Sequence, residues 1–144
     1  MKLARYKRIL ITGAGGSAGV NFTRSLWLGR EHFYTVGTDN SRYYIKLSRT
    51  HRNYLVPNCK DENYISELNK LIDKEKIGFL HAQPDPEVLV ISANRNKLNA
   101  RTLLPSHEAI VLSQNKYLLN CHLYENNVSV PHTWLIDSKE TLQL

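Results

Sequence analysis

The sequence predicts an α/β fold, in which a Rossmann-like, doubly wound and mostly parallel sheet of four or five strands carries helices on both faces. Three observations predict this fold. Short apolar runs alternate with segments of helical periodicity. The first apolar run leads directly into a glycine-rich turn at residues 13–19, which then opens an apolar-periodic helix. The chain has 144 residues, the length of one domain with its own hydrophobic core.

In the first part of the chain, strands and helices alternate regularly. Apolar runs bounded by glycine, proline or acidic residues predict strands, and apolar residues at helical spacing predict helices. The second strand ends in Asp39, and a polar, irregular segment over residues 40–52 follows it. The predicted elements are a strand at 8–12, a helix at 17–29, strands at 34–39 and 54–56, a helix that starts near Asp61, and a strand at 78–82.

The second part of the chain continues the alternation after Pro84 and Pro86. Ser106 is expected to cap a short helix. Ser138 begins a further helix of only about six residues, which is unstable in water unless something packs on it. We therefore expect the natural protein to continue beyond Leu144 or a partner to cover this end, the alternative being a frayed natural terminus. The predicted elements are a helix at 87–98, a strand at 101–104, helices at 107–111 and 114–125, and a strand-like run at 132–136.

The composition is that of an ordinary soluble domain, with 22% charged and 42% hydrophobic residues. No apolar run approaches the roughly 18 residues of a membrane span, and the short apolar run after the basic N-terminus does not fit a signal peptide. Cys59 and Cys121 share no motif spacing and suit a reducing cytosol as small buried side chains. We therefore expect a cytoplasmic protein with no membrane partner.

Much of the net charge of +6 falls in two places, residues 2–8 and residues 42–52. Such a run is usually a solvated face of a folded domain. A rim that faces phosphate groups and a nucleic-acid surface are the alternatives. The sequence has neither zinc-finger spacing nor an RNA-binding aromatic signature, so nucleic acid is not an expected partner.

The glycine-rich turn is the first candidate binding site. Its backbone N–H groups and the N-terminus of the following helix favour an anionic ligand at the carboxyl end of the first strand. Gly13, Gly15 and Gly16 are therefore candidates for close approach to substrate or phosphate, the alternative being a tight turn that binds nothing. The Ser17 hydroxyl either donates to the same anion or caps the helix.

Acidic and amide side chains follow two other strands to the same edge of the sheet. Asp39 can accept a hydrogen bond from a ligand hydroxyl or amine, or it can cap the turn that follows it. Gln83, Asp85 and Glu87 come after the fourth strand, and two carboxylates in a crevice suit an amine or hydroxyl substrate. The alternative is that these acids complement a helix N-terminus.

No catalytic residue and no metal ligand is predicted. The six histidines have no metal-ligand spacing, and His81 is interpreted as a core or edge residue. Trp27 and Trp134 are interpreted as core or interface aromatics.

An NAD(P)-binding Rossmann domain is one interpretation of the turn. Gly13, Gly16 and Gly19 have the spacing of extended short-chain dehydrogenases, and Asp39 lies 20 residues after Gly19, near where a ribose-binding acid is expected. None of the eight tyrosines is followed four residues later by the lysine that those enzymes use. That pair usually lies beyond residue 144, so this alternative stays open.

Two later segments carry a family resemblance. Residues 80–89, Leu-His-Ala-Gln-Pro-Asp-Pro-Glu-Val-Leu, place a strand end before a proline, an acid pair and a helix. Residues 113–133 place a lysine near a helix start, then a short turn and a Pro-x-Thr segment. With the glycine turn, Asp39 and the strand that Pro57 closes, they occur in the order found in ATP-grasp enzymes. Over about residues 7–144 the chain resembles the N-terminal, pre-ATP-grasp domain of a ligase similar to the carbamoyl-phosphate synthase large subunit.

The resemblance implies a division of the chain and a reaction. Residues 1–130 would form the pre-ATP-grasp domain, and residues 131–144 would begin the ATP-grasp domain. The full enzyme would phosphorylate a carboxylate with MgATP and pass the acyl group to an amine or other nucleophile. In this family the ligands of ATP and Mg²⁺ belong to later domains, so this fragment is expected to be inactive alone and to hold no cofactor tightly.

The resemblance also implies the partners. They are a small-molecule carboxylate substrate and the remaining ATP-grasp domains, and a homodimer with a second copy of this chain is a further predicted assembly. The glycine turn would face substrate or an acyl-phosphate intermediate and would not hold NAD. A non-catalytic binding or assembly module is the third interpretation that stays open beside the ligase and the NAD(P) domain.

Overall fold

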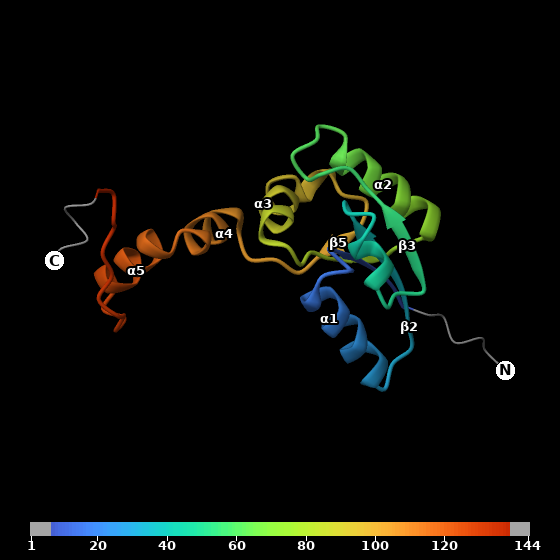
Figure 1. Ribbon diagram of the computed structural model, residues 1–144, viewed down its shortest axis with the longest axis horizontal. Coiled ribbons are helices and arrows are strands. Elements are labelled where there is room, and N and C mark those ends of the chain that lie inside the picture. Colours follow the sequence, from blue (N-terminus) through green and yellow to red (C-terminus); the bar gives the residue numbers. More distant parts are fainter. Residues whose placement is uncertain (1–6, 139–144) are drawn as a thin grey trace. The chain divides into compact units, whose positions relative to one another are not determined.

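The computed structural model describes residues 7–138, and a five-stranded sheet forms the centre of its first part (Figure 1). The chain divides into two compact units between Leu104 and Pro105. The second unit holds α4 (His107–Gln114) and α5 (Lys116–Glu125). The first unit holds β1 (Lys7–Thr12), α1 (Ser17–Leu28), β2 (Phe33–Asp39), the 3₁₀ helix η1 (Tyr44–Leu47), β3 (Arg52–Leu55), α2 (Tyr64–Glu75), β4 (Phe79–His81), α3 (Asp85–Ala93), the 3₁₀ helix η2 (Arg95–Lys97) and β5 (Arg101–Thr102).

The sheet is parallel throughout, with the strand order β3-β2-β1-β4-β5. The pairing of β1 with β2 runs from Lys7 opposite Phe33 to Thr12 opposite Thr38. From β1 the chain builds one side of the sheet with β2 and β3 and then returns to build the other side with β4 and β5. In such sheets a crevice lies outside the carboxyl ends of the strands at the point of reversal. The predicted doubly wound α/β fold is confirmed.

Helices cover both faces because side chains alternate across the strands. Leu10 is fully buried in the larger core cluster, with Leu68 of α2 and Ile91 of α3. Ile11, the next residue of β1, points to the opposite face and is buried in a second cluster, against which Phe22 of α1 packs. Burying each such aliphatic side chain stabilises the fold by about 1.5–3 kcal/mol.

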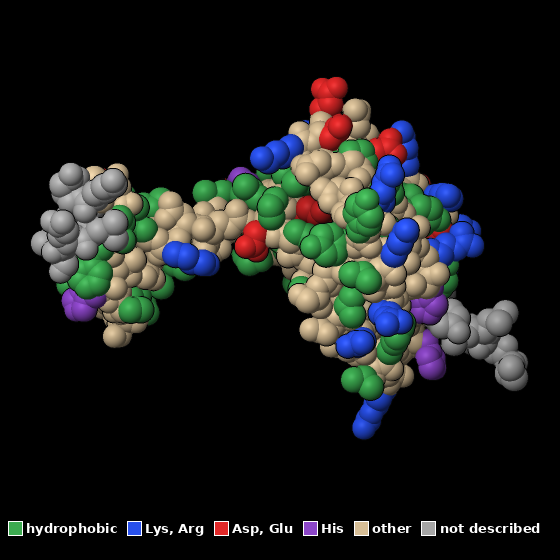
Figure 2. Space-filling view, in the orientation of Figure 1, with side chains coloured by type: hydrophobic (Ala, Val, Ile, Leu, Met, Phe, Trp, Pro, Cys, Tyr) green, Lys and Arg blue, Asp and Glu red, His purple; other side chains and the backbone are tan. Residues whose placement is uncertain are grey.

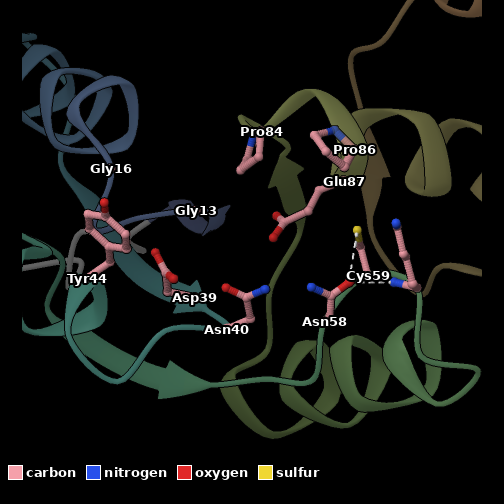
Figure 3. Close-up of a pocket in the computed structure, with 11 residues that line it drawn as sticks. Gly13, Gly16, Asp39, Asn40, Tyr44, Asn58, Cys59, Pro84, Pro86 and Glu87 are labelled. Atoms are coloured by element: carbon pink, nitrogen blue, oxygen red, sulfur yellow. Dashed lines mark hydrogen bonds between the residues drawn. The ribbon is translucent and has the colours of Figure 1, made fainter.

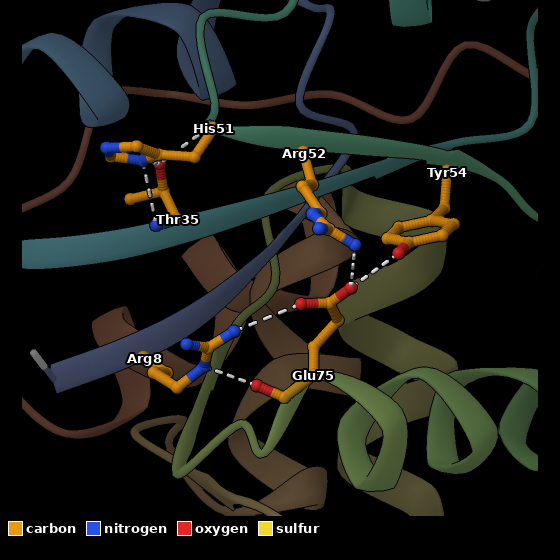
Figure 4. Close-up of polar contacts among 6 residues, drawn as sticks. All are labelled: Arg8, Thr35, His51, Arg52, Tyr54 and Glu75. Carbon is orange, nitrogen blue, oxygen red and sulfur yellow. Dashed lines mark hydrogen bonds and ion pairs between the residues drawn. The ribbon is translucent and has the colours of Figure 1, made fainter.

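A buried carboxylate joins α2 to the amino-terminal ends of two strands (Figure 4). The Glu75 side chain is only 5% exposed, and its carboxylate accepts hydrogen bonds from Arg8 Nη2 at 3.1 Å, from Arg52 Nη1 at 3.4 Å and from the Tyr54 hydroxyl. Arg8 also donates from Nε to the Glu75 carbonyl, and its guanidinium lies 4.0 Å from the centre of the Tyr34 ring. This network lies at the edge of the sheet away from the crevice.

The helices of the second unit begin at side-chain caps. Ser106 Oγ accepts a hydrogen bond from the Ala109 amide at 3.2 Å, so the predicted cap is confirmed. Asn115 Oδ1 accepts one from the Leu118 amide at 3.1 Å and caps α5. Caps of this kind are worth about 1 kcal/mol each.

Some predicted boundaries differ from the observed ones. The helix expected at 87–98 begins earlier, at Asp85, because a proline in the first turn gives up no helical hydrogen bond. It also ends earlier, at Ala93. The strand expected at 101–104 is only two residues long, and the helix expected at 107–111 extends to Gln114.

The strand expected at 132–136 is wrong. These residues form no strand and are exposed, and the described residues of the second unit contain no strand that could pair with them. Trp134 is 71% exposed and Trp27 is 53% exposed, so the core interpretation of both is wrong as well. The helix expected after Ser138 falls in residues 139–144, outside the described part of the chain.

Basic side chains are spread over the described surface. Arg42, Lys46 and Arg49 are exposed. On the face that Figure 2 shows, Lys and Arg side chains lie among hydrophobic and uncharged ones. This favours the solvated-face interpretation of the segment at 42–52. Within residues 7–138, no helix has the length and apolar character needed to cross a membrane.

Candidate functional site

A pocket of about 320 Å³ lies at the carboxyl edge of the sheet (Figure 3). The turns after β1, β2, β3 and β4 all contribute to its walls, as expected for a crevice at the reversal of strand order. The structure therefore brings together four of the predicted site residues, which are Gly13, Gly16, Asp39 and Glu87.

The glycine turn is held by the protein's own backbone and by Asp39. The amide of Ala14 donates to the Thr38 carbonyl at 3.0 Å, and that of Gly16 donates to the Gly13 carbonyl at 3.0 Å. The Gly15 amide donates to Asp39 Oδ2 at 3.4 Å. These three amides already have partners, so they are not free to bind an anion as the turn alone would suggest.

Close contacts leave no room for a Cβ at three glycines of the turn, Gly13, Gly15 and Gly19. Gly13 has φ +57°, and a Cβ there would lie 2.3 Å from the Pro84 ring. A Cβ at Gly15 would lie 1.8 Å from the carbonyl oxygen of Tyr44 in η1. Gly15 therefore accommodates the chain's own segment after β2, and this segment covers the turn on that side.

Asp39 caps the turn after β2, as one of its two predicted roles requires, and its role toward a ligand stays a prediction. It is 6% exposed and lines the pocket. Its Oδ1 accepts a hydrogen bond from the Ser41 amide at 2.9 Å, which caps the turn after β2, while Oδ2 accepts the Gly15 amide. These two bonds fix the orientation of the carboxylate.

Glu87 is a second buried carboxyl group, and no backbone amide is seen to donate a hydrogen bond to its Oε2. It is 6% exposed, it points into the pocket in Figure 3, and its Oε2 has no hydrogen-bond partner. Burial, above all, raises the pKa of Glu87, and the charge of Asp39 raises it further, while the hydroxyls of Thr12 and Tyr64 act in the opposite direction. A buried carboxyl with a raised pKa in a cleft is typical of a functional site.

Glu87 also lies in the first turn of α3, with Asp85, where a carboxylate complements the helix dipole. The N-cap position of α3 is Pro84, and no side chain caps the helix through a hydrogen bond. The helix-terminus alternative therefore stays open beside a role toward a ligand, and the burial of Glu87 is what that alternative leaves unexplained.

The other predicted residues lie outside the pocket lining. The cap of α1 is Gly16 and no side chain caps this helix, so the capping interpretation of Ser17 is wrong, while its role toward a ligand stays a prediction. The Gln83 amide donates to Thr12 Oγ1 at 3.3 Å, and its side chain contacts the His81 ring. Asp85 is exposed at the start of α3. The roles of Gln83 and Asp85 stay predictions.

Sequence reasoning missed two buried polar side chains that interact with Glu87, those of Tyr64 and Cys59. Tyr64 of α2 fits the apolar spacing of a helix, yet its hydroxyl is buried without a hydrogen bond, and burial together with Glu87 raises its pKa. The Cys59 thiol is buried at the pocket, and burial raises its pKa too. The signal that could have found Tyr64 is its hydroxyl on an otherwise apolar helix face, because a buried phenol usually needs a partner.

Replacing Glu87 with glutamine is expected to stabilise the protein at neutral pH by about 1 kcal/mol. Because the folded-state pKa of Glu87 is raised, the folded protein binds more protons than the unfolded chain above about pH 4.3, so wild-type stability falls as the pH rises through this range. The variant lacks that loss, and its advantage in urea unfolding should grow with pH. A variant no more stable than wild type at any pH would contradict a costly buried carboxyl.

A dinucleotide fits this geometry poorly. Binding of NAD(P) at the turn needs free backbone amides and a free acid after the second strand. Here Asp39 already accepts two amide hydrogens, and the backbone of Tyr44 packs against Gly15. Within residues 7–138, no group of three or more His, Cys, Asp or Glu side chains is arranged to hold a metal ion.

The fold and the pocket define a Rossmann-like domain whose candidate site opens at the carboxyl edge of a parallel sheet. The family model for the PylC-like, N-terminal domain matches residues 9–103, more than half of the chain. The chain therefore belongs to the PylC-like N-terminal domain family, and it is an N-terminal domain of the ATP-grasp type.

Two solved structures share the fold. An L-amino acid ligase from Bacillus licheniformis is 16% identical with a TM-score of 0.63, and the match covers 88% of this chain and 32% of that one. The UDP-D-quinovosamine 4-dehydrogenase from Vibrio fischeri is 24% identical with a TM-score of 0.50, and the match covers 76% and 87% of the two chains. The chain thus spans about a third of the length of the ligase. No curated protein matches the sequence.

Proposed function

We propose that this chain is the substrate-side, N-terminal domain of an ATP-grasp ligase that joins a carboxylate to an amine or a related nucleophile. The observation that carries the proposal is a pocket with two buried carboxyl groups, Asp39 and Glu87, in a domain of the PylC-like N-terminal family. The similarity to the fold of an L-amino acid ligase supports it. The closer likeness to the carbamoyl-phosphate synthase large subunit rests on the order of the sequence segments.

In this proposal the chain holds substrate, and other domains hold the nucleotide. The residues described here fit a triphosphate poorly, because two carboxyl groups line the pocket and the amides of the glycine turn donate within the protein. ATP and Mg²⁺ would therefore be bound by domains that follow, with residues 1–130 as the pre-ATP-grasp domain and residues 131–144 as the start of the next. This chain alone would be inactive.

The proposed partners follow from the assignment of substrate to this domain and of the nucleotide to the domains that come after it. They are the substrates of the ligation, with a small-molecule carboxylate among them, the remaining ATP-grasp domains and, in a homodimer, a second copy. The enzyme would work in the cytoplasm, where ATP is available. The geometry disfavours the NAD(P)-binding alternative. The amides of residues 14–16 all donate within the protein, and both carboxylate oxygens of Asp39 already accept a backbone amide hydrogen.

A nucleotide-release assay on the polypeptide that the natural gene encodes tests the proposal. We expect ADP and phosphate to form only when ATP, Mg²⁺, a carboxylate and an amine are supplied together, as with a panel of amino acids, and an amide product to appear. Residues 1–144 alone should release no ADP. Absence of substrate-dependent ADP from the natural polypeptide, or saturable binding of NAD(P) to this chain at micromolar concentration, would overturn the proposal.

A further inference from the structure

The polar interior of the pocket is acidic. Asp39 and Glu87 are each 6% exposed, and their carboxyl groups approach the cavity from different turns (Figure 3). Three amides of the glycine turn, those of Ala14, Gly16 and Gly15, donate to Thr38, Gly13 and Asp39. An anion would meet two carboxyl groups and none of these three donors, so the interior suits a cation that carries N–H groups.

The two carboxyl groups differ in what they have left to bind. Both oxygens of Asp39 accept a backbone amide hydrogen. Glu87 Oε2 is buried with no hydrogen-bond partner, and the Glu87 side chain points into the pocket in Figure 3. A buried acceptor without a partner is rare in native proteins and calls for a donor that arrives with a ligand.

The surrounding groups set the charge of Glu87. Asp39 at the end of β2 is an acid, while burial raises the pKa of both Cys59 and Tyr64 and so keeps these two groups neutral. Lys60 lines the same pocket but is exposed, so water screens its charge. Burial, above all, and the charge of Asp39 raise the pKa of Glu87, the hydroxyls of Thr12 and Tyr64 act against them, and the net direction is upward.

We propose that the Glu87 side chain binds the primary ammonium group of a substrate, with its carboxylate as the hydrogen-bond acceptor. The proposal rests on the proposed function in one respect, that this edge of the sheet receives substrate. The ammonium group keeps its three protons, and no bond between carbon, nitrogen and oxygen atoms changes. Where Glu87 is protonated, its O–H bond breaks as the ammonium group binds, and that proton passes to the buffer. The remainder of the ligand would be aliphatic, because Tyr44, Pro84 and Pro86 provide apolar wall surface.

Ethylammonium chloride is the probe that tests this, titrated into isotope-labelled chain and followed by the amide resonances of residues around the pocket. We expect saturable shifts at Gly13 and Asn40 that tetramethylammonium, a cation without N–H groups, and sodium acetate do not cause. In Glu87→Gln the affinity should fall about tenfold to a hundredfold, because a charged hydrogen-bonded pair is lost. The matched control Glu62→Gln, an exposed acid outside the pocket lining, should bind as wild type does.

Proton release gives a second readout that a merely structural role of Glu87 would not produce. Wild-type affinity for ethylammonium should rise with pH up to about tenfold per pH unit through the titration of Glu87, and the rise should vanish in Glu87→Gln. The spectrum of the variant shows whether it is folded. Equal binding by the variant, no saturable shift, or tighter binding of acetate would overturn the proposal.

The failure of this inference is distinguishable from the failure of the proposed function. The natural polypeptide could form an amide in an ATP-dependent reaction while its N-terminal domain does not bind ethylammonium. That result would refute the ammonium site alone. Ethylammonium binding at Glu87 without any substrate-dependent ADP release would support the site and refute the ligase.

Discussion

Replacing Gly15 with alanine is expected to lower the free energy of unfolding by about 2–3 kcal/mol, because the new methyl group has no space. Its Cβ would lie 1.8 Å from the carbonyl oxygen and 2.2 Å from the carbonyl carbon of Tyr44. Both are backbone atoms, so no side-chain rotation relieves the contact. The segment that contains η1 must move, and the hydrogen bond from the Gly15 amide to Asp39 is expected to break with it.

Urea unfolding of the variant measures this effect, and Gly78→Ala is the matched control. A Cβ at Gly78 meets nothing within 4 Å, so the control should stay within about 0.5 kcal/mol of wild type or gain slightly from a stiffer unfolded chain. If the two variants unfolded at the same urea concentration, the packing of η1 on the glycine turn would be refuted.

Replacing Glu75 with glutamine should cost about 2 kcal/mol at neutral pH. The side chain of Glu75 is 5% exposed and is shared by Arg8, Arg52 and the Tyr54 hydroxyl. Glutamine keeps the shape but not the charge, so its amide presents donors where the network needs acceptors. Arg8 and Arg52 are 32% and 59% exposed, and water can solvate them after the change, which limits the loss.

The loss depends on pH in a defined direction. The Tyr54 hydroxyl, above all, and then the charges of Arg52 and Arg8 hold the pKa of Glu75 below its usual value, although burial acts against them. A lowered pKa stabilises the fold above about pH 4.3, and this stabilisation disappears as the pH falls through the folded-state pKa. The difference between wild type and Glu75→Gln should therefore shrink in acid.

Chemical denaturation at several pH values tests this, with Glu67→Gln as the control. Glu67 pairs with Lys70 on the surface of α2, where its loss should cost less than about 0.5 kcal/mol. A pH-independent difference for Glu75→Gln, or equal losses for the two variants, would contradict a buried charged network.

The sequence predicts the β1–turn–α1 unit and the sheet because both depend on local pattern. Apolar runs, the glycine turn and helical periodicity carry that information, and parallel strands bring their carboxyl ends to one edge. For this reason Gly13, Asp39 and Glu87 could be named before their positions were known. The sequence also left two roles open for Asp39, and the structure shows it both capping a turn and lining the pocket.

What the sequence could not predict depends on tertiary contacts. The packing of Tyr44 against Gly15 follows from the path of an irregular loop, which has no periodicity. The burial of the Tyr64 hydroxyl could be predicted only if one knew which end of α2 faces the carboxyl edge of the sheet. The run at 132–136 has the residues of a strand, but a strand forms only where another can pair with it.

The carboxyl resonance of Glu87, followed from acid to neutral pH in the free protein and in the urea-unfolded chain, tests the central claim most directly. The central claim is that the crevice holds a buried carboxyl group, that of Glu87, with one oxygen that has no hydrogen-bond partner and can accept a hydrogen bond from a cationic ligand. It predicts a folded-state midpoint clearly above the unfolded one. A folded-state midpoint equal to or below the unfolded value would show a solvated or already paired carboxylate and would contradict the account.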